Sequence, residues 1–325
     1  MPAIVSHLHL VTESDATVFE HRARAHKTFA LSYKEGESRR TMVGALNRVA
    51  STFSSGKHDG ASFPWEILVD GSLTSELMSI VAPQFEPATT QRDSAAIRKI
   101  LKCFWRVGFL TLDEFTNAKD FELPRTATAQ RQRQSLSKAE LANLLQFSGK
   151  INPIKAARDQ ALLFALASSG ARRTEITQVT LEDVHLEDGY LWLPTTKMGI
   201  PRKAWMHSQA ISVIHQWMHT RGNDPGMLFP PLSRTCRPIT ERVMSSHQVW
   251  TIVTDRAKIA QVPWLTPHDL RRYAVTQLLA AGHDISLVAR IIGHKSIMST
   301  ARYDTRGNEA CRIAINDLEI PNSIR

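Results

Sequence analysis

The sequence predicts a mostly α-helical, two-domain protein with one small antiparallel β-sheet, an α+β fold. Its length of 325 residues is too great for one ordinary domain and comfortable for two. Apolar residues recur at helical spacing through most of the chain. Between residues 184 and 206, short runs of strand-favouring residues alternate with turn signals, which predicts a small sheet. We expect domains at residues 1–123 and 139–325, with a linker over residues 124–138.

The first domain is predicted to be helical throughout. Residues 1–35 show weak periodicity, and we expect them to be partly disordered. A helix is expected from Ser38, with a break at Gly56–Gly60. The apolar stripe of this helix consists of Met42, Leu46, Val49, Ala50 and Phe53. Further helices are expected over Thr74–Val81, Thr90–Trp105 and Leu110–Phe121.

The linker between the domains, Pro124–Lys138, is polar and basic, and Leu136 is its only large apolar residue. Arg and Lys displace the counterions condensed on a phosphate backbone, so such a segment can follow DNA. A solvated spacer explains the same residues equally well.

The second domain is predicted to begin with a capped helix, because Ser137 and Glu140 have the spacing of a capping box. A buried helix, Arg158–Ser169, follows and ends at Gly170. The expected strands are Val184–Leu186, Tyr190–Pro194 and Ala204–Met206. Later helices are expected around Ile211–Met218, over Val243–Ile259, from Pro267 to Gly282, over Ile285–Ile292, and from Ser296.

Composition narrows the class of protein. Lys and Arg number 40 against 31 Asp and Glu, a net charge of +9, which suits a folded protein with a cationic face for a polyanion. The three cysteines are far apart and show neither a disulfide framework nor metal-ligand spacing. No apolar run is long enough to span a membrane, and the first residues lack the pattern of a secretory signal. We therefore expect a cytoplasmic protein with no membrane partner.

One local pattern suits a phosphate group. Thr266 is a natural N-cap, Pro267 favours the first helical position, and Asp269 sits at the third. His268 and Arg271 are three apart, so they share a face of that helix. The helix start adds partial positive charge. By itself this H-x-x-R pattern has little specificity.

Three further patches accompany it: Arg172 after a helix stop, Lys197 in a tight turn, and His294 after Gly293, followed by Tyr303. Together the four resemble the tyrosine recombinase (phage integrase) family. The motifs that carry the resemblance are Gly170-Ala-Arg-Arg-Thr-Glu, His268-Asp-Leu-Arg271, and Ile292-Gly-His-Lys-Ser-Ile-Met-Ser-Thr-Ala-Arg-Tyr303. The likeness covers nearly the whole chain and is weakest in the first half. It implies an N-terminal helical core-binding domain and a catalytic domain, which clamp duplex DNA.

The resemblance also implies roles for the residues. Tyr303 would attack the DNA phosphate, and the resulting intermediate is a 3′-phosphotyrosine. Arg172, Arg271 and His294 would stabilise the charge that builds on the phosphate oxygens. Lys197 would protonate the leaving 5′ oxygen, and His268 would act as the base for the tyrosine hydroxyl. Glu175 would orient Arg172, and no metal or cofactor is expected.

Some assignments have rivals in the sequence. Arg173 stands where the family usually has an apolar residue and could replace Arg172 in a register shifted by one. Lys203 and Arg202 compete with Lys197, and Tyr273 competes with Tyr303, although we interpret Tyr273 as a core residue. The candidate DNA contacts outside the reaction centre are Arg39, Arg40, Arg131, Arg133, Arg173 and Arg202.

The expected partners are double-stranded DNA with an inverted-repeat core site and a homotetramer on two such sites, which exchanges strands through a Holliday junction. An accessory protein is a further partner that the sequence leaves open. The segment Cys311–Leu318 would dock on a neighbouring subunit or, alternatively, pack on its own domain. The expected tasks are mobile-element integration and excision, cointegrate resolution, or dimer resolution. The rival functions are a type IB topoisomerase-like enzyme and a catalytically silent architectural DNA-binding protein.

Overall fold

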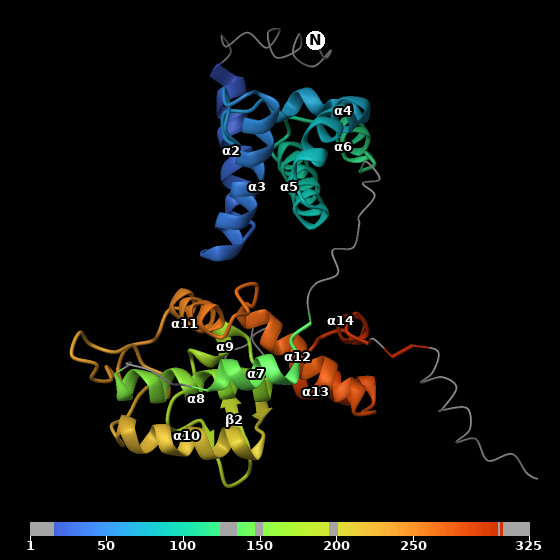
Figure 1. The fold of residues 1–325 in the computed structure, drawn as a ribbon. Coiled ribbons are helices and arrows are strands. Elements are labelled where there is room, and N and C mark those ends of the chain that lie inside the picture. Colours follow the sequence, from blue (N-terminus) through green and yellow to red (C-terminus); the bar gives the residue numbers. More distant parts are fainter. Residues whose placement is uncertain (1–15, 124–134, 147–151, 195–200, 305, 308–325) are drawn as a thin grey trace, which may run out of the picture. The chain divides into compact units, whose positions relative to one another are not determined.

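The computed structural model describes residues 16–123, 135–146, 152–194, 201–304 and 306–307 (Figure 1). Contacts between residues divide the chain into two compact units, Met1–Gln132 and Arg133–Arg325. Most of the linker predicted at residues 124–138 lies outside the described residues.

The first unit is helical throughout its described part. Its helices are α2 (Ala16–Leu31), α3 (Glu37–Phe53), α4 (Gly71–Val81), α5 (Pro87–Arg106) and α6 (Leu112–Lys119). Two short 3₁₀ segments, Trp65–Val69 and Ala82–Gln84, join them. Helix α5 packs against α2, α3 and α6, around a core that includes Phe29, Leu46, Trp65, Met78 and Phe104.

Helix α2 corrects the expectation of partial disorder before residue 35, at least from Ala16 onward. Its periodicity is weak because, among its side chains whose burial is described, Ala25 and Phe29 are the fully buried apolar ones. Arg22 of the same helix is ion-paired with Glu66, so a polar contact across the unit also holds it. Propensity and tertiary contacts of this kind form a helix without a wide apolar stripe.

The second unit surrounds the buried helix α8 (Pro153–Ser169), which contacts α7 (Lys138–Leu145), α10 (Ser208–Arg221) and α12 (Pro267–Ala280). The three-stranded antiparallel sheet has the order β1 (Val184–His185), β2 (Tyr190–Leu193), β3 (Arg202–Trp205). The remaining helices are α9 (Arg173–Ile176), α11 (Ser246–Ile259), α13 (Ile285–Ile292) and α14 (Ile297–Ala301). The predicted α+β class, mostly helical with a small antiparallel sheet, is confirmed.

Local signals set several helix ends as predicted. Capping boxes join Ser137 to Glu140 and Thr266 to Asp269. Gly170 ends α8 and Gly293 ends α13, both in the left-handed conformation, with φ of 58° and 73°. None of the helices in the described ranges has the length and apolar character that crossing a membrane requires.

Candidate active site

Arg271 lies on α12 and points inward. Its residue is 3% exposed, and its Nη1 donates to the carbonyl oxygen of Gly170 at 2.5 Å. The other terminal nitrogen, Nη2, is buried and has no hydrogen-bond partner among the described residues. Burial, with the nearby charges of Arg172 and Arg202, lowers the pKa of Arg271 to about 9. A buried guanidinium with an unused donor and cationic neighbours is suited to receive an anion.

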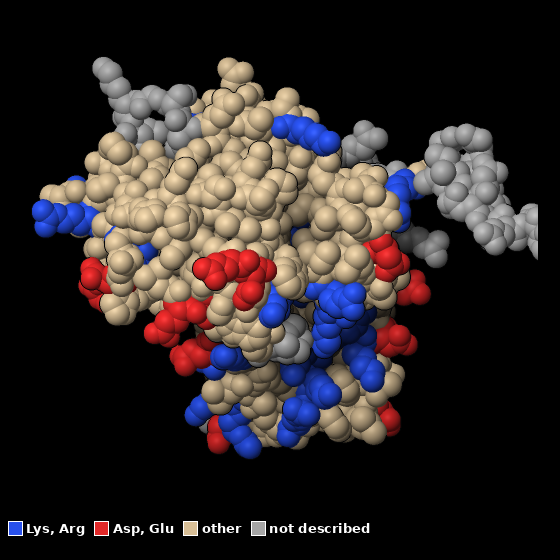
Figure 2. All heavy atoms as spheres, turned by 90° about the horizontal axis from the view of Figure 1, so that it is seen from below, with Lys and Arg blue, Asp and Glu red and all other residues tan. Residues whose placement is uncertain are grey.

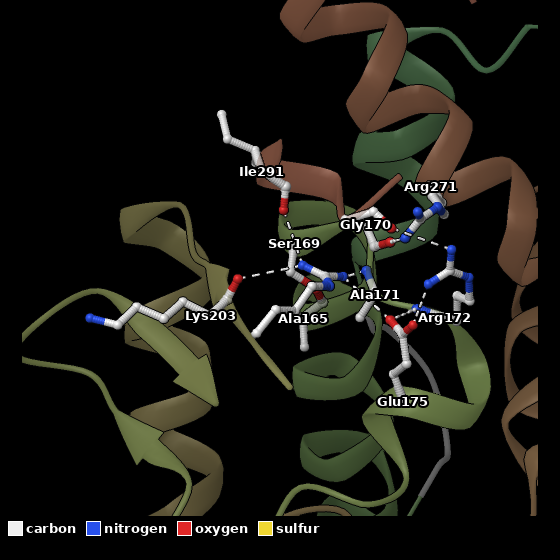
Figure 3. A network of polar contacts seen from close by, with 11 residues as sticks. Ala165, Ser169, Gly170, Ala171, Arg172, Glu175, Lys203, Arg271 and Ile291 are labelled. Atoms are coloured by element: carbon white, nitrogen blue, oxygen red, sulfur yellow. Dashed lines mark hydrogen bonds and ion pairs between the residues drawn. The ribbon is translucent and has the colours of Figure 1, made fainter. Parts of the chain in front are cut away.

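Arg172 forms the N-cap of α9, immediately after the turn at Gly170. Its Nη1 is ion-paired with Glu175, its backbone N–H donates to the same carboxylate at 3.0 Å, and its Nη2 donates to the carbonyl of Gly293 at 3.5 Å. Figure 3 shows Arg172 and Glu175 side by side, with Arg271 close to Arg172. Although burial opposes it, hydrogen bonding from Arg172 holds the pKa of Glu175 below its usual value. Glu175 is therefore an ionised partner that fixes the guanidinium.

His294 leaves the helix end at Gly293 and is half-buried. Its Nδ1 lies 2.8 Å from Oγ1 of Thr300, which is fully buried. Burial and the charges of Arg271 and Arg172 lower the pKa of His294 to about 4. The imidazole is therefore neutral at neutral pH and acts as a hydrogen-bonding group.

Tyr303 follows α14 in a short turn. Its Oη lies 3.3 Å from Nε2 of His268. Its ring stacks on the His294 ring at a centroid separation of 6.2 Å, and the Arg272 guanidinium lies 6.0 Å from its centroid. The structure thus brings Arg172, Arg271, His268, His294 and Tyr303 together from α9, α12 and the α13–α14 region.

The two rivals of Lys197 lie on β3 and differ in direction. Arg202 points into the cluster, with its Nη2 3.3 Å from Glu175 Oε2. Lys203 extends away from Arg172 and Glu175 (Figure 3), and its Nζ lies 4.3 Å from the centroid of Tyr190. Lys197 itself lies outside the described residues.

The sequence also predicted candidate DNA contacts outside the reaction centre. Arg39 and Arg40 are on α3 of the first unit, and Arg39 Nη2 donates to the carbonyl of Tyr33 at 3.2 Å. Arg173 is the first residue of α9 and is half-buried. Arg131, Arg133 and the segment Cys311–Leu318 lie outside the described residues.

Tyr273, the rival of Tyr303 in the sequence, lies on α12. It packs against the second unit's core, and burial raises the pKa of its hydroxyl. Across the described ranges, no group of three or more His, Cys, Asp or Glu could hold a metal ion.

Two members of the cluster were not assigned these contacts from the sequence. Thr300 holds His294, and its place in the histidine-to-tyrosine segment was the only signal for it. Arg202 was expected as a DNA contact or a rival acid, whereas its guanidinium lies against Glu175 and the end of α13. Arg202 and Ile291 are 89 positions apart, so no local sequence pattern could predict their contact.

Comparisons with known proteins agree on a family. The model of the phage integrase family matches residues 134–310, more than half of the chain. Tyrosine recombinase XerA of Pyrococcus furiosus is 25% identical over 203 residues, which are 62% of this chain and 66% of that relative, just under two thirds of its length. Tyrosine recombinase XerC of Erythrobacter litoralis is 28% identical over 245 residues, 74% of this chain and 75% of the relative.

Solved structures share the fold. The Tn1549 transposon integrase in complex with transposon right end DNA has a TM-score of 0.65 at 18% identity, covering 93% of this chain and 99% of the other. The XerH site-specific recombinase bound to difH substrate has a TM-score of 0.64 at 17% identity, covering 94% of this chain and 90% of the other.

Proposed function

Because the chain belongs to the phage integrase family of tyrosine recombinases, enzymes that break and rejoin DNA, we propose that it is a site-specific recombinase with Tyr303 as its nucleophile. The observation that carries the assignment of the nucleophile is the position of Tyr303 Oη, 3.3 Å from His268 Nε2. The chain has four tyrosines, and this one lies beside His268 and interacts electrostatically with the buried Arg271.

In the proposed cleavage step, the Tyr303 Oη–phosphorus bond forms while the bond from phosphorus to the 5′ oxygen breaks. His268 takes the phenolic proton, and Lys197 gives a proton to the leaving 5′ oxygen. The product is a 3′-phosphotyrosine and a free 5′ hydroxyl. Rejoining reverses each transfer, and the phosphotyrosine keeps the bond energy, so the cycle consumes no ATP.

Electrostatics support this step. Negative charge builds on the non-bridging oxygens, and fixed donors that already face the phosphate stabilise it most. Arg271 offers its buried Nη2, Arg172 is held by Glu175, and neutral His294 can donate through its outer nitrogen. Guanidinium groups bind two oxygens in one plane, which suits a tetrahedral phosphate.

We propose double-stranded DNA with an inverted-repeat core site as the partner. The net charge of +9 favours a polyanion, and Figure 2 shows Lys and Arg gathered over part of the face it draws. Four protomers on two sites would exchange strands through a Holliday junction, with Cys311–Leu318 docking on a neighbouring subunit. Arg39, Arg40, Arg131, Arg133 and Arg173 would contact the DNA outside the reaction centre.

The test begins with DNA that flanks the gene in its source genome. Duplex fragments that tile this DNA are incubated with the full chain, the reaction is stopped with SDS, and covalently bound fragments are sequenced. Nicked suicide duplexes of the trapped site, which lose the cleaved end and cannot rejoin, then give the rate of adduct formation. We expect the adduct to disappear in Tyr303→Phe and to persist in the matched control Tyr273→Phe.

Other outcomes would overturn the proposal. An adduct that survives in Tyr303→Phe would refute the nucleophile. Specific binding without any adduct would identify an architectural protein, and relaxation of plasmid without a specific site by monomers would identify a topoisomerase-like enzyme. The location of the trapped site distinguishes the proposed tasks: element ends for integration and excision, a transposon-borne site for cointegrate resolution, or a replicon site for dimer resolution.

A further inference from the structure

Arg202 is a buried cation to which the proposed reaction assigns no part. It is the first residue of β3, and its side chain is 13% exposed. Its Nη1 donates to the carbonyl oxygen of Ile291 at 3.0 Å, and its Nη2 donates to Glu175 Oε2 at 3.3 Å. One guanidinium therefore joins the sheet to both α9 and the end of α13.

The stem of Arg202 also lies directly against Gly293. A Cβ added at Gly293 would meet Arg202 Nε at 2.6 Å and Cδ at 2.7 Å. This approach is closer than any side chain at residue 293 would allow. Gly293 is the residue from which His294 departs, so Arg202 supports the backbone that aims the imidazole.

Arg202 shares Glu175 with Arg172. The carboxylate is 1% exposed, with one oxygen paired to Arg172 Nη1 and the other reached by Arg202 Nη2. Arg172 in turn donates to the carbonyl of Gly293. Arg172 and Arg202 therefore both contact the Glu175 carboxylate, and both donate to backbone carbonyls at the C-terminal end of α13.

We propose that Arg202 is a positioning residue, which fixes Arg172 through Glu175 and His294 through Gly293, and does not itself bind the DNA backbone. This inference rests on the proposed function. Its role requires the planar fork of arginine, because the acceptors on Ile291 and Glu175 take different terminal nitrogens. A lysine at this position would offer one donor nitrogen in place of two nitrogens held in a fixed fork, so it could not reproduce both contacts with the same geometry.

The proposal predicts a loss of rate without a loss of affinity. Displacement of catalytic groups by about 1 Å can cost on the order of 100-fold in rate. We expect Arg202→Met to lower the rate constant for adduct formation about 10- to 100-fold on the trapped suicide duplex at saturating protein. Arg202→Lys should stay at least about 10-fold below the parent. The matched control is Lys203→Met, which removes the same charge from the next residue, whose side chain points away from the cluster.

Fitted amplitudes and rate constants separate positioning from folding. A variant that merely folds poorly loses amplitude, because fewer molecules react, while the folded fraction keeps the parent's rate constant. If Arg202→Met does not fold, Arg202→Lys, which keeps the buried charge, carries the test. A parent rate constant in either folded variant would overturn the proposal.

The second test of the proposal measures DNA binding in a Tyr303→Phe background, so that no cleavage occurs. We expect Arg202→Met to leave both the affinity and its dependence on salt unchanged. Weaker binding with a salt slope reduced by about 1 would identify Arg202 as a phosphate contact and refute the positioning role. Absence of any adduct with the parent chain would instead refute the proposed function, so the two failures are distinguishable.

Discussion

His268 Nε2 and Tyr303 Oη lie 3.3 Å apart although 35 residues separate them in the chain. The contact forms because α12 packs on α13 and α13 packs on α14, which returns the turn after α14 to the start of α12. The N-cap Thr266 and its partner Asp269 fix that start. Helix packing therefore places the proposed base next to the proposed nucleophile.

The first prediction concerns this pair. His268→Gln keeps a hydrogen-bonding side chain of similar reach but cannot take the phenolic proton. We expect the rate constant for adduct formation to fall about 10²- to 10⁴-fold, the usual contribution of a positioned base. Rapid-quench measurement on the suicide duplex checks it, with His283→Gln, at an exposed histidine beyond α12, as the control. Equal rates for His268→Gln and the parent would assign the proton to another group.

The second prediction concerns the Thr300 hydroxyl, 2.8 Å from His294 Nδ1. If this hydroxyl donates to Nδ1, the ring proton stays on Nε2, where it can reach a phosphate oxygen. Thr300→Val removes the hydroxyl at constant shape and should slow cleavage on the order of 10-fold, about 1.4 kcal/mol of lost stabilisation. Nitrogen-15 NMR of the His294 ring should report a changed tautomer balance.

Thr300→Ser is the matched control, because it keeps the hydroxyl and loses only a methyl group. It should retain the parent's tautomer and cleavage rate. A Ser variant as slow as the Val variant would show that packing of the methyl group, rather than the hydrogen bond, matters at this position.

The third prediction concerns acid stability. The pKa of His294 is lowered by burial and by Arg271 from 6.5 to about 4 in the folded protein. Between these two pH values the unfolded chain therefore binds more protons than the folded protein. The stability that the neutral His294 ring contributes to the folded protein is fully present above pH 6.5 and is lost as the pH falls toward 4. His294→Gln should flatten the dependence of the unfolding free energy on pH in that window. Urea denaturation at several pH values measures it, and an unchanged slope would contradict the assignment.

The fourth prediction compares two glycines that have a positive φ and that each follow the end of a helix. At Gly170 (φ +58°) an added Cβ would lie 2.7 Å from Ile292 Cδ1 and 3.5 Å from Arg271 Cγ, whereas at Gly282 (φ +88°) nothing lies within 4 Å. Both Ala variants pay about 1–2 kcal/mol for the left-handed backbone. Gly170→Ala should cost roughly a further 1–3 kcal/mol from overpacking, and should also slow cleavage by moving Arg271. The free energy of unfolding of both variants is measured with denaturant. An equal loss of stability in Gly170→Ala and Gly282→Ala would contradict the close approach of Ile292 to Gly170.

Several elements were predictable because their signals are local. The ends of α8, α12 and α13 follow from Gly170, Thr266 and Gly293, each acting within one turn of its own helix. Turn signals predicted β2 in the same way. Strand β3 was expected at Ala204–Met206 but begins earlier, at Arg202, because Arg202 and Lys203 pair with the far end of β2. Helix α2 was missed because few of its apolar side chains, Ala25 and Phe29 among them, are fully buried, which leaves only a faint periodic pattern.

The sequence by itself determined the fold class, the family motifs and the residue types from which a phosphate site could be built. Only the tertiary structure decided which of them meet: that Arg202 turns inward to Glu175 while Lys203 turns away, and that Thr300 holds His294. The physical reason is range. Caps and turns depend on neighbours within a few residues, whereas the Arg271–Gly170 and Arg172–Gly293 contacts join positions 101 and 121 residues apart and exist only once the helices have packed.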